Sequence, residues 1–142
     1  MLFRLSILLL ITVLRLRAAE VIPFADAPHS YWTSPSQDAI AQMIERMDSG
    51  AFKPDRSSER ACLESFLKEL NIAPSTQLLV YSATSLQSGL IRPDNPRALF
   101  FNDEVYVGYV PGGKMEVVAI DPALGPVFYI TENRFNDPVG RG

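Results

Sequence analysis

The clearest pattern in the chain is a series of short apolar runs separated by turn signals between residues 97 and 131. The runs are rich in Val, Tyr, Phe and Ile, which are favoured in strands, and spacers this short join antiparallel neighbours. The turn signals are Asn102-Asp103, Pro111-Gly112-Gly113-Lys114 and Pro122-Ala123-Leu124-Gly125. The pattern predicts a four-stranded meander that is apolar on both faces, so each face needs a cover.

Two amphipathic patterns come before this meander. In the first, Ile40, Met43, Ile44 and Met47 recur at helical spacing. Residues 34–37 resemble a capping box with Ser34 as the N-cap, and Gly50 is a natural C-terminal stop.

Pro54 separates this helix from the second amphipathic pattern, which ends near Asn71. One stripe of the second helix carries Cys62, Leu63, Phe66, Leu67 and Leu70. Residues 77–82 then form a short apolar strand, and the turn-rich segment 83–96 is the best candidate for a loop that forms a site. Together these patterns predict an α+β fold in which two N-terminal amphipathic helices pack on an antiparallel β-meander of about four to five strands.

The N-terminus carries an apolar run at residues 5–14, with Arg4 before it. About ten apolar residues suit a signal peptide, whereas a membrane-spanning helix needs roughly 20. We therefore expect residues 1–19 to be a signal peptide or an uncleaved N-terminal anchor, and the protein to be exported, to the periplasm or outside the cell. Residues 20–35 follow as an extended segment rich in aromatic residues and proline, residues 36–131 as a single domain, and residues 132–142 as a flexible tail.

Composition and charge exclude several classes of function. The chain has 142 residues, a formal net charge of -3 and no basic cluster outside the N-terminal segment, so nothing indicates nucleic-acid binding. With one cysteine, Cys62, it has no internal disulfide, no CxxC pair and no thiolate metal cage. We expect membrane association only through an uncleaved N-terminal segment.

Few residues suggest chemistry. Asp26 and His29 have the spacing of a metal-ligand or base pair, and His29 with Cys62 would be the one thiol–imidazole pair available to a small hydrolase. The apolar stripe around Cys62 favours an inert thiol. Arg92 and Arg97 flank a turn and could clamp an anion, although ion pairs within the protein are the commoner arrangement.

The remaining candidates are turn residues and surface side chains. Glycines and a lysine at residues 111–114 join two strands, without a helix N-terminus to bind phosphate. Carboxylates at Asp103, Glu104, Glu116 and Asp121 suit turns better than a hydrolytic pair. We assign no catalytic, cofactor-binding or metal residue. The candidate surface or pocket comprises His29, Tyr31, Trp32, Arg92, Arg97, Tyr106 and Tyr109.

Three segments together resemble a known group of proteins: LLVYSATSLQ from Leu78, IRPDNPRALFFNDEVYVGYVPGG from Ile91, and EVVAIDPALGPVFYI from Glu116. They are similar to the N-terminal module of exported, largely uncharacterised bacterial proteins that look like c-type cytochromes. In that group a CxxCH haem motif follows the module. Tyr109 here stands in place of the group's Trp, and Pro111 in place of a polar residue.

This chain has no CxxCH motif, so the resemblance implies haem c in related longer proteins and none bound covalently here. The chain would be a truncated or split piece of a cytochrome-like protein, or a haem-free relative. We expect an exported, non-catalytic accessory module whose partner is a cytochrome-type domain or protein. The alternatives are a small-ligand-binding domain with a pocket between the second helix and loop 83–96, and a small hydrolase using His29 and Cys62.

Overall fold

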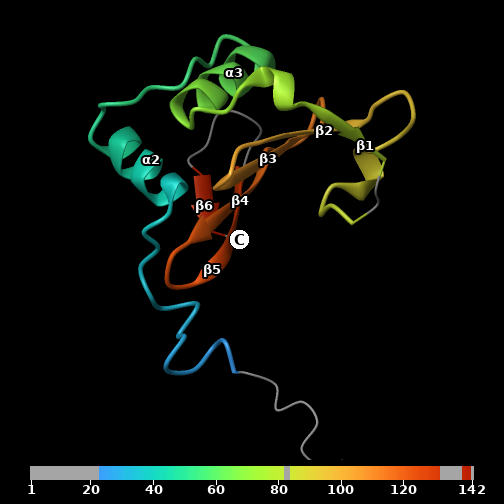
Figure 1. Cartoon of the computed structure of the whole chain (residues 1–142). Helices are drawn as coiled ribbons and strands as arrows, with labels where there is room; N and C mark the ends of the chain where they lie inside the picture. The colour runs from blue at the N-terminus through green and yellow to red at the C-terminus, as the bar shows by residue number, and fades with distance from the viewer. Residues whose placement is uncertain (1–22, 82–83, 132–138, 142) are drawn as a thin grey trace, which may run out of the picture. The chain divides into compact units, whose positions relative to one another are not determined.

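A computed structural model describes residues 23–81, 84–131 and 139–141. The described residues form a six-stranded antiparallel sheet in which neighbouring strands follow chain order, together with two α-helices (Figure 1). The strands are β1 (Leu78–Val80), β2 (Arg97–Phe101), β3 (Val105–Tyr109), β4 (Glu116–Asp121), β5 (Gly125–Thr131) and β6 (Val139–Arg141). The chain divides into two compact units, one ending at Ser34 and the other beginning at Pro35, and the sheet belongs to the second.

The first helix of the second unit, α2 (Ala39–Asp48), begins at Asp38. The Asp38 carboxylate accepts hydrogen bonds from the backbone N–H groups of Ile40 and Ala41, which have no partner within the helix. Helix α2 buries Ile40 and Met43, and the chain leaves it through Gly50, whose φ of 76° is in the left-handed region.

The second helix, α3 (Glu59–Glu69), is capped by the Ser58 hydroxyl, which accepts from the Ala61 N–H. It buries Cys62, Leu63, Phe66 and Leu67. Two short 3-10 helices follow, η2 (Pro74–Thr76) and η3 (Ser88–Leu90). Arg46 and Glu69 join α2 to α3 through an ion pair of 2.6 Å.

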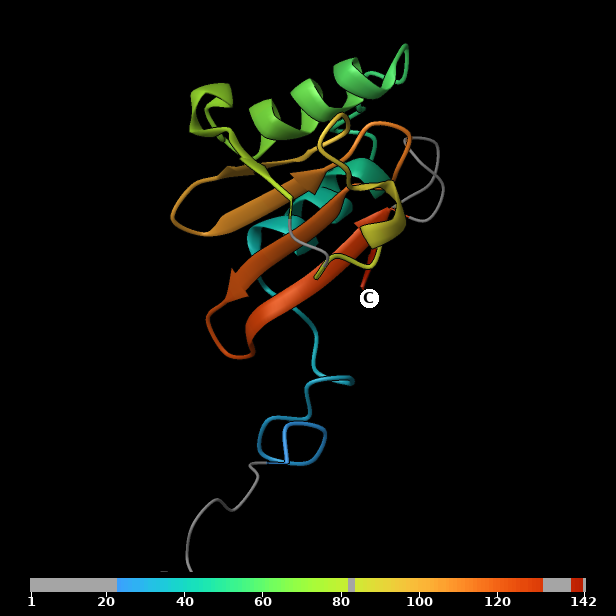
Figure 2. The same cartoon turned by 90° about the vertical axis from the view of Figure 1, so that its right-hand side faces the viewer.

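The hydrophobic core lies between the helices and one face of the sheet, which we call the inner face. Its side chains alternate along the strands and are buried: Ala98, Phe100, Val105, Val107, Val117, Ala119, Val127 and Tyr129. The strand register places Phe100 beside Val107, and Val107 beside Val117. In Figure 2, α2 lies behind the sheet and the loop with η3 lies in front of it, so the helix and the loop cover opposite faces.

The expected fold class is wrong in its strand number and in the position of its helices. Six strands are present instead of four to five, because the backbone of 139–141 pairs with β5. That Gly-rich segment has no apolar pattern to predict a strand and was expected to be a loose tail. The helices lie at 39–48 and 59–69, and so are not N-terminal. The N-cap of α2 is Asp38, not Ser34, because Asp38 supplies the acceptor for the first free N–H groups.

Residues 23–34 form a series of turns in which three rings meet edge to edge. Tyr31 contacts Trp32 with ring centroids 5.0 Å apart, and Phe24 contacts both. Among the described residues, no helix has the length and apolar character needed to cross a membrane. The expected leader, residues 1–19, lies outside the described part of the chain and stays a prediction.

Candidate functional site

The opposite face of the sheet, which we call the outer face, carries a charged pair. Arg97 on β2 and Glu116 on β4 approach to 2.8 Å, and their side chains are 17% and 13% exposed. Gly108 on β3 lies between them, and its missing side chain makes room for the guanidinium. A Cβ at Gly108 would lie 2.6 Å from Arg97 Nε and 2.8 Å from Arg97 Cζ, closer than atoms normally approach. The sheet therefore holds Arg97 flat against its backbone.

The loop after β1 is tied to this pair. Ser85 Oγ donates to Glu116 Oε1 at 2.8 Å, and Gln87 Nε2 donates to the same oxygen at 3.1 Å and to the Lys114 carbonyl at 2.8 Å. The Lys114 N–H donates to Gln87 Oε1 in return. These bonds fix the loop that the sequence marks as site-forming, and they leave the Glu116 carboxylate fully engaged inside the protein.

The two candidate arginines each pair within the protein. Arg92 Nε lies 3.4 Å from Asp94 Oδ1 in an exposed turn, while Arg97 pairs with the part-buried Glu116. The two guanidinium groups are therefore not arranged as a free pair that clamps an anion. Gly108, Ser85 and Gln87 complete the Arg97 site and were not predicted individually. The strand register places Gly108, whereas the path of the loop after β1 places Ser85 and Gln87.

The two candidate tyrosines lie on opposite faces of β3. Tyr106 on the outer face is 47% exposed, and its ring stacks on Phe101 with centroids 5.8 Å apart. Tyr109 on the inner face donates from its hydroxyl to Glu59 Oε2 at 2.9 Å. Burial of the phenol and then this hydrogen bond raise the pKa of Tyr109 to about 12. Glu59 also accepts from the Gly112 N–H, so Tyr109 helps to anchor α3 on the β3–β4 turn.

His29, Tyr31 and Trp32 belong to the unit that ends at Ser34, with the aromatic cluster described above. The His29 carbonyl accepts from the Ser34 hydroxyl at 3.3 Å. Cys62 belongs to the other unit and is 1% exposed. Burial raises the pKa of the Cys62 thiol, and this disfavours the thiolate that a nucleophile or metal ligand needs.

Two buried carboxylates have structural roles. Asp38, besides capping α2, accepts from the Tyr129 hydroxyl at 2.6 Å. Asp121 Oδ2 accepts from the Gln37 N–H at 2.6 Å, while Asp121 Oδ1 accepts from two N–H groups of the β4–β5 turn. The turn role expected of Asp121 agrees with these bonds, whereas Asp38 was missed. Among the residues described, no three His, Cys, Asp or Glu side chains gather as metal ligands would.

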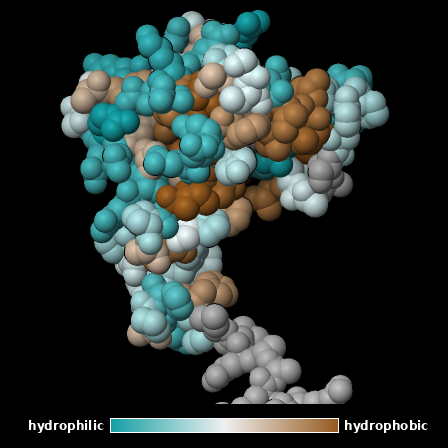
Figure 3. Space-filling model, in the orientation of Figure 1, coloured by the Kyte–Doolittle hydropathy of each residue, from teal (hydrophilic) through white to brown (hydrophobic). Residues whose placement is uncertain are grey.

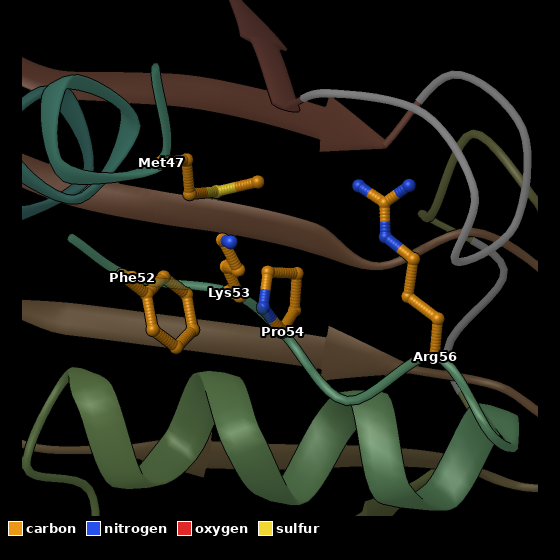
Figure 4. Close-up of a pocket in the computed structure, with 5 residues that line it drawn as sticks. All are labelled: Met47, Phe52, Lys53, Pro54 and Arg56. Atoms are coloured by element: carbon orange, nitrogen blue, oxygen red, sulfur yellow. The ribbon is translucent and has the colours of Figure 1, made fainter. Parts of the chain in front are cut away.

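A hollow of about 320 Å³ opens beside the connector between the two helices, and Figure 4 shows its lining. It is lined by Met47, Phe52, Lys53, Pro54 and Arg56. Its volume is at the lower end of the range for ligand pockets. The hollow lies away from the place expected from the sequence, between the second helix and loop 83–96. Phe52 was an available signal, since an aromatic side chain is unusual in a short connector.

The outer face also carries a row of apolar side chains across four strands. The register pairs Phe101 with Tyr106, Tyr106 with Val118, and Val118 with Phe128. We call these four residues the outer row. Phe128 is 55% exposed, and Ile120 beside the row is 45% exposed. On the inner face, in contrast, Val105 and Val107 of β3 and Val117 and Ala119 of β4 are buried.

Comparisons with protein-family models, curated proteins and solved structures found no match to this chain.

Proposed function

We propose that the chain is an exported, non-catalytic accessory module that packs its outer row against a cytochrome-type domain. The resemblance of residues 78–130 to modules that precede a haem domain suggests the kind of partner. The N-terminal apolar run is the reason to expect export. The outer row is the surface that would bind the partner, and the proposal rests on this observation.

The outer row has the properties of a protein interface. Soluble monomers rarely expose large contiguous apolar patches, and exposed patches of this kind often mark contact sites. Aromatic side chains are enriched among interface anchors, and the row contains Phe101, Tyr106 and Phe128.

The polar groups near the row support a non-catalytic role. Arg97, Glu116, Ser85 and Gln87 bind one another and fix a loop. A catalytic acid or base has to reach a substrate, whereas these side chains already use their donors and acceptors to hold the fold. Their arrangement stiffens the outer face, and a rigid face loses less entropy when a partner docks.

Variants on the row test this proposal. The full chain is produced with a c-type cytochrome maturation system and mixed with the CxxCH-containing domain of one of the longer proteins that it resembles. We expect a complex in size-exclusion chromatography. Phe128→Ser should weaken this complex at least about tenfold, the effect typical of an interface anchor. Leu79→Ser is the matched control, because Leu79 is 53% exposed, close to the 55% of Phe128, but lies on the inner side of β1, and it should bind normally. Covalent haem on this chain, or normal binding by Phe128→Ser, would overturn the proposal.

The hollow near α2 favours a second candidate function, a small-ligand-binding domain. Met47, Phe52 and Pro54 supply the apolar part of the lining, and Lys53 and Arg56 supply two cationic side chains. Such a lining suits a small apolar molecule with a negative group. A thermal-shift screen should find stabilising compounds of that class whose effect is lost in Phe52→Ala. A screen of that class without a hit would remove this candidate.

A further inference from the structure

Strand β1 forms one edge of the sheet and exposes large apolar side chains on both faces. Leu78 on the outer side is 54% exposed, Leu79 on the inner side is 53% exposed, and Tyr81 just beyond the strand is 61% exposed. Within the described residues, β1 pairs with β2 alone, so its other edge carries main-chain groups that no strand of this chain pairs. The edge therefore offers both hydrogen-bonding groups and apolar area.

The segment around this edge carries no charge. Residues 73–91 contain no Asp, Glu, Lys or Arg, although 20% of the whole chain is charged. Natural proteins protect edge strands with lysines, prolines, bulges or a covering segment, because an open edge pairs with other chains. Strand β1 itself contains no proline or charged side chain. Apart from its shortness, which also limits pairing, β1 shows none of these protective features among the described residues.

From these observations we infer that β1 pairs with β1 of a second copy, antiparallel and across a two-fold axis. In the pairing centred on Leu79, Leu79 faces its own copy, and Leu78 faces Val80 of the other protomer. The hydrogen-bonding pattern of antiparallel strands is symmetric, so one edge complements itself. The two six-stranded sheets then form one continuous sheet.

The absence of charge is the reason for choosing a second copy as the occupant. Two copies of a charged edge would repel each other, whereas two copies of this edge bring no like charges together. A charged partner, in turn, would find no counter-charge in residues 73–91. Within each protomer the apolar surface extends from β1 onto β2, because Leu78 lies beside Leu99 of β2. Figure 3 shows apolar side chains gathered over β1 and β2.

The interface is small, since β1 has three residues. We therefore expect a weak dimer with a Kd on the order of 10 µM, as for other interfaces of low area. This surface is separate from the outer row that the proposed function uses. β1 is at one edge of the sheet, and Phe128 is on β5, four strands away in the sheet order. Dimer formation and partner binding can thus be tested independently.

The test is sedimentation equilibrium of the full chain over a range of concentrations, with two lysine variants. Leu79→Lys places two ammonium groups face to face at the two-fold axis and should raise the dimer Kd at least about tenfold. Phe128→Lys is the matched control, because Phe128 and Leu79 are 55% and 53% exposed. This control should dimerise like the unchanged protein. A chain that stays monomeric at concentrations well above the expected Kd, or a dimer that persists in Leu79→Lys, overturns the inference.

Hydrogen exchange of the unchanged protein gives a second readout that needs no variant. Backbone amides of residues 78–80 should exchange more slowly as the protein concentration rises, while those of β5 should not change. Amides of β1 that exchange at the same rate at all concentrations would overturn the inference. Protection that grows instead at β6 would place the contact at the opposite edge and would overturn it as well.

Discussion

The ion pair between Arg97 and Glu116 makes a sharp prediction about stability. Arg97→Met removes the cation and leaves a carboxylate that is 13% exposed, with Ser85 and Gln87 as its remaining donors. Glu116→Met leaves a guanidinium that is 17% exposed without its counter-charge. Breaking a buried pair from one side costs about 3 to 5 kcal/mol, and the residual exposure here reduces our expectation to about 2 to 3 kcal/mol for each variant.

The double variant Arg97→Met with Glu116→Met should cost less than either single change. It removes both charges and adds two apolar side chains of similar length to an apolar face, and such replacements are often close to neutral. The coupling free energy is the sum of the two single costs minus the cost of the double variant. It should therefore exceed about 2 to 3 kcal/mol, and it should reach about 4 to 6 kcal/mol if the double replacement is neutral. Because the pair is only slightly exposed, this coupling should persist when the salt concentration is raised.

Gly108→Ala supplies an independent variant on the same pair. The added Cβ would lie 2.6 Å from Arg97 Nε, so the guanidinium has to leave its position. We expect a loss of about 1 to 2 kcal/mol, even though alanine is favoured over glycine within a strand by roughly 0.5 to 1 kcal/mol. In the Arg97→Met background, the crowded atoms are gone, and the same change should be neutral or stabilising.

Urea unfolding followed by circular dichroism measures all of these free energies. Unchanged m-values would show that the variants unfold the same structure. Additive costs for Arg97→Met and Glu116→Met would refute the pairing. An effect of Gly108→Ala that is the same with and without Arg97 would refute the close approach of the guanidinium to the β3 backbone.

Two further predictions concern single titrating groups. Because the folded protein raises the pKa of Tyr109 to about 12, above the ordinary value of 10.0, its contribution to stability is present below pH 10 and is lost as the pH rises towards 12. The urea midpoint should fall more steeply over that range in the unchanged protein than in Tyr109→Phe, and equal slopes would contradict the raised pKa of Tyr109. Cys62 should react with a thiol reagent such as DTNB only after unfolding, because it is 1% exposed and burial raises the pKa of its thiol. Rapid reaction of the folded protein would contradict its burial.

Patterning predicted much of the local structure. The turn signals at 102–103, 111–114 and 122–125 separate the four strands from β2 to β5, and the apolar stripe of α3 contains the residues that the structure buries. Both kinds of signal are local, because turn residues and helical periodicity act within a few positions. No local sequence signal predicts β6, which pairs with β5 through its backbone. The sequence does not distinguish Asp38 from Ser34 as the N-cap of α2 either, since both residue types are good caps.

The candidate site was harder to predict, because it depends on register. Arg97 and Tyr106 were singled out from their types, and both lie on the outer face. Their partners Glu116 and Phe101 come from other strands, and a shift of one residue in pairing would turn each side chain to the other face. Glu116 was interpreted as a turn residue for this reason. The meeting of Ser85 with Glu116 depends on how a turn-rich loop folds over the sheet, which periodicity cannot indicate.

We propose that the outer row binds a cytochrome-type domain, and NMR measures such binding residue by residue. The isotopically labelled chain is titrated with the CxxCH-containing domain of one of the longer proteins that it resembles. We expect chemical-shift changes at the backbone amides of Phe101, Tyr106, Val118 and Phe128, with those of α3 unchanged. Changes confined to the helices, or no changes at saturating concentrations of that domain, would contradict it.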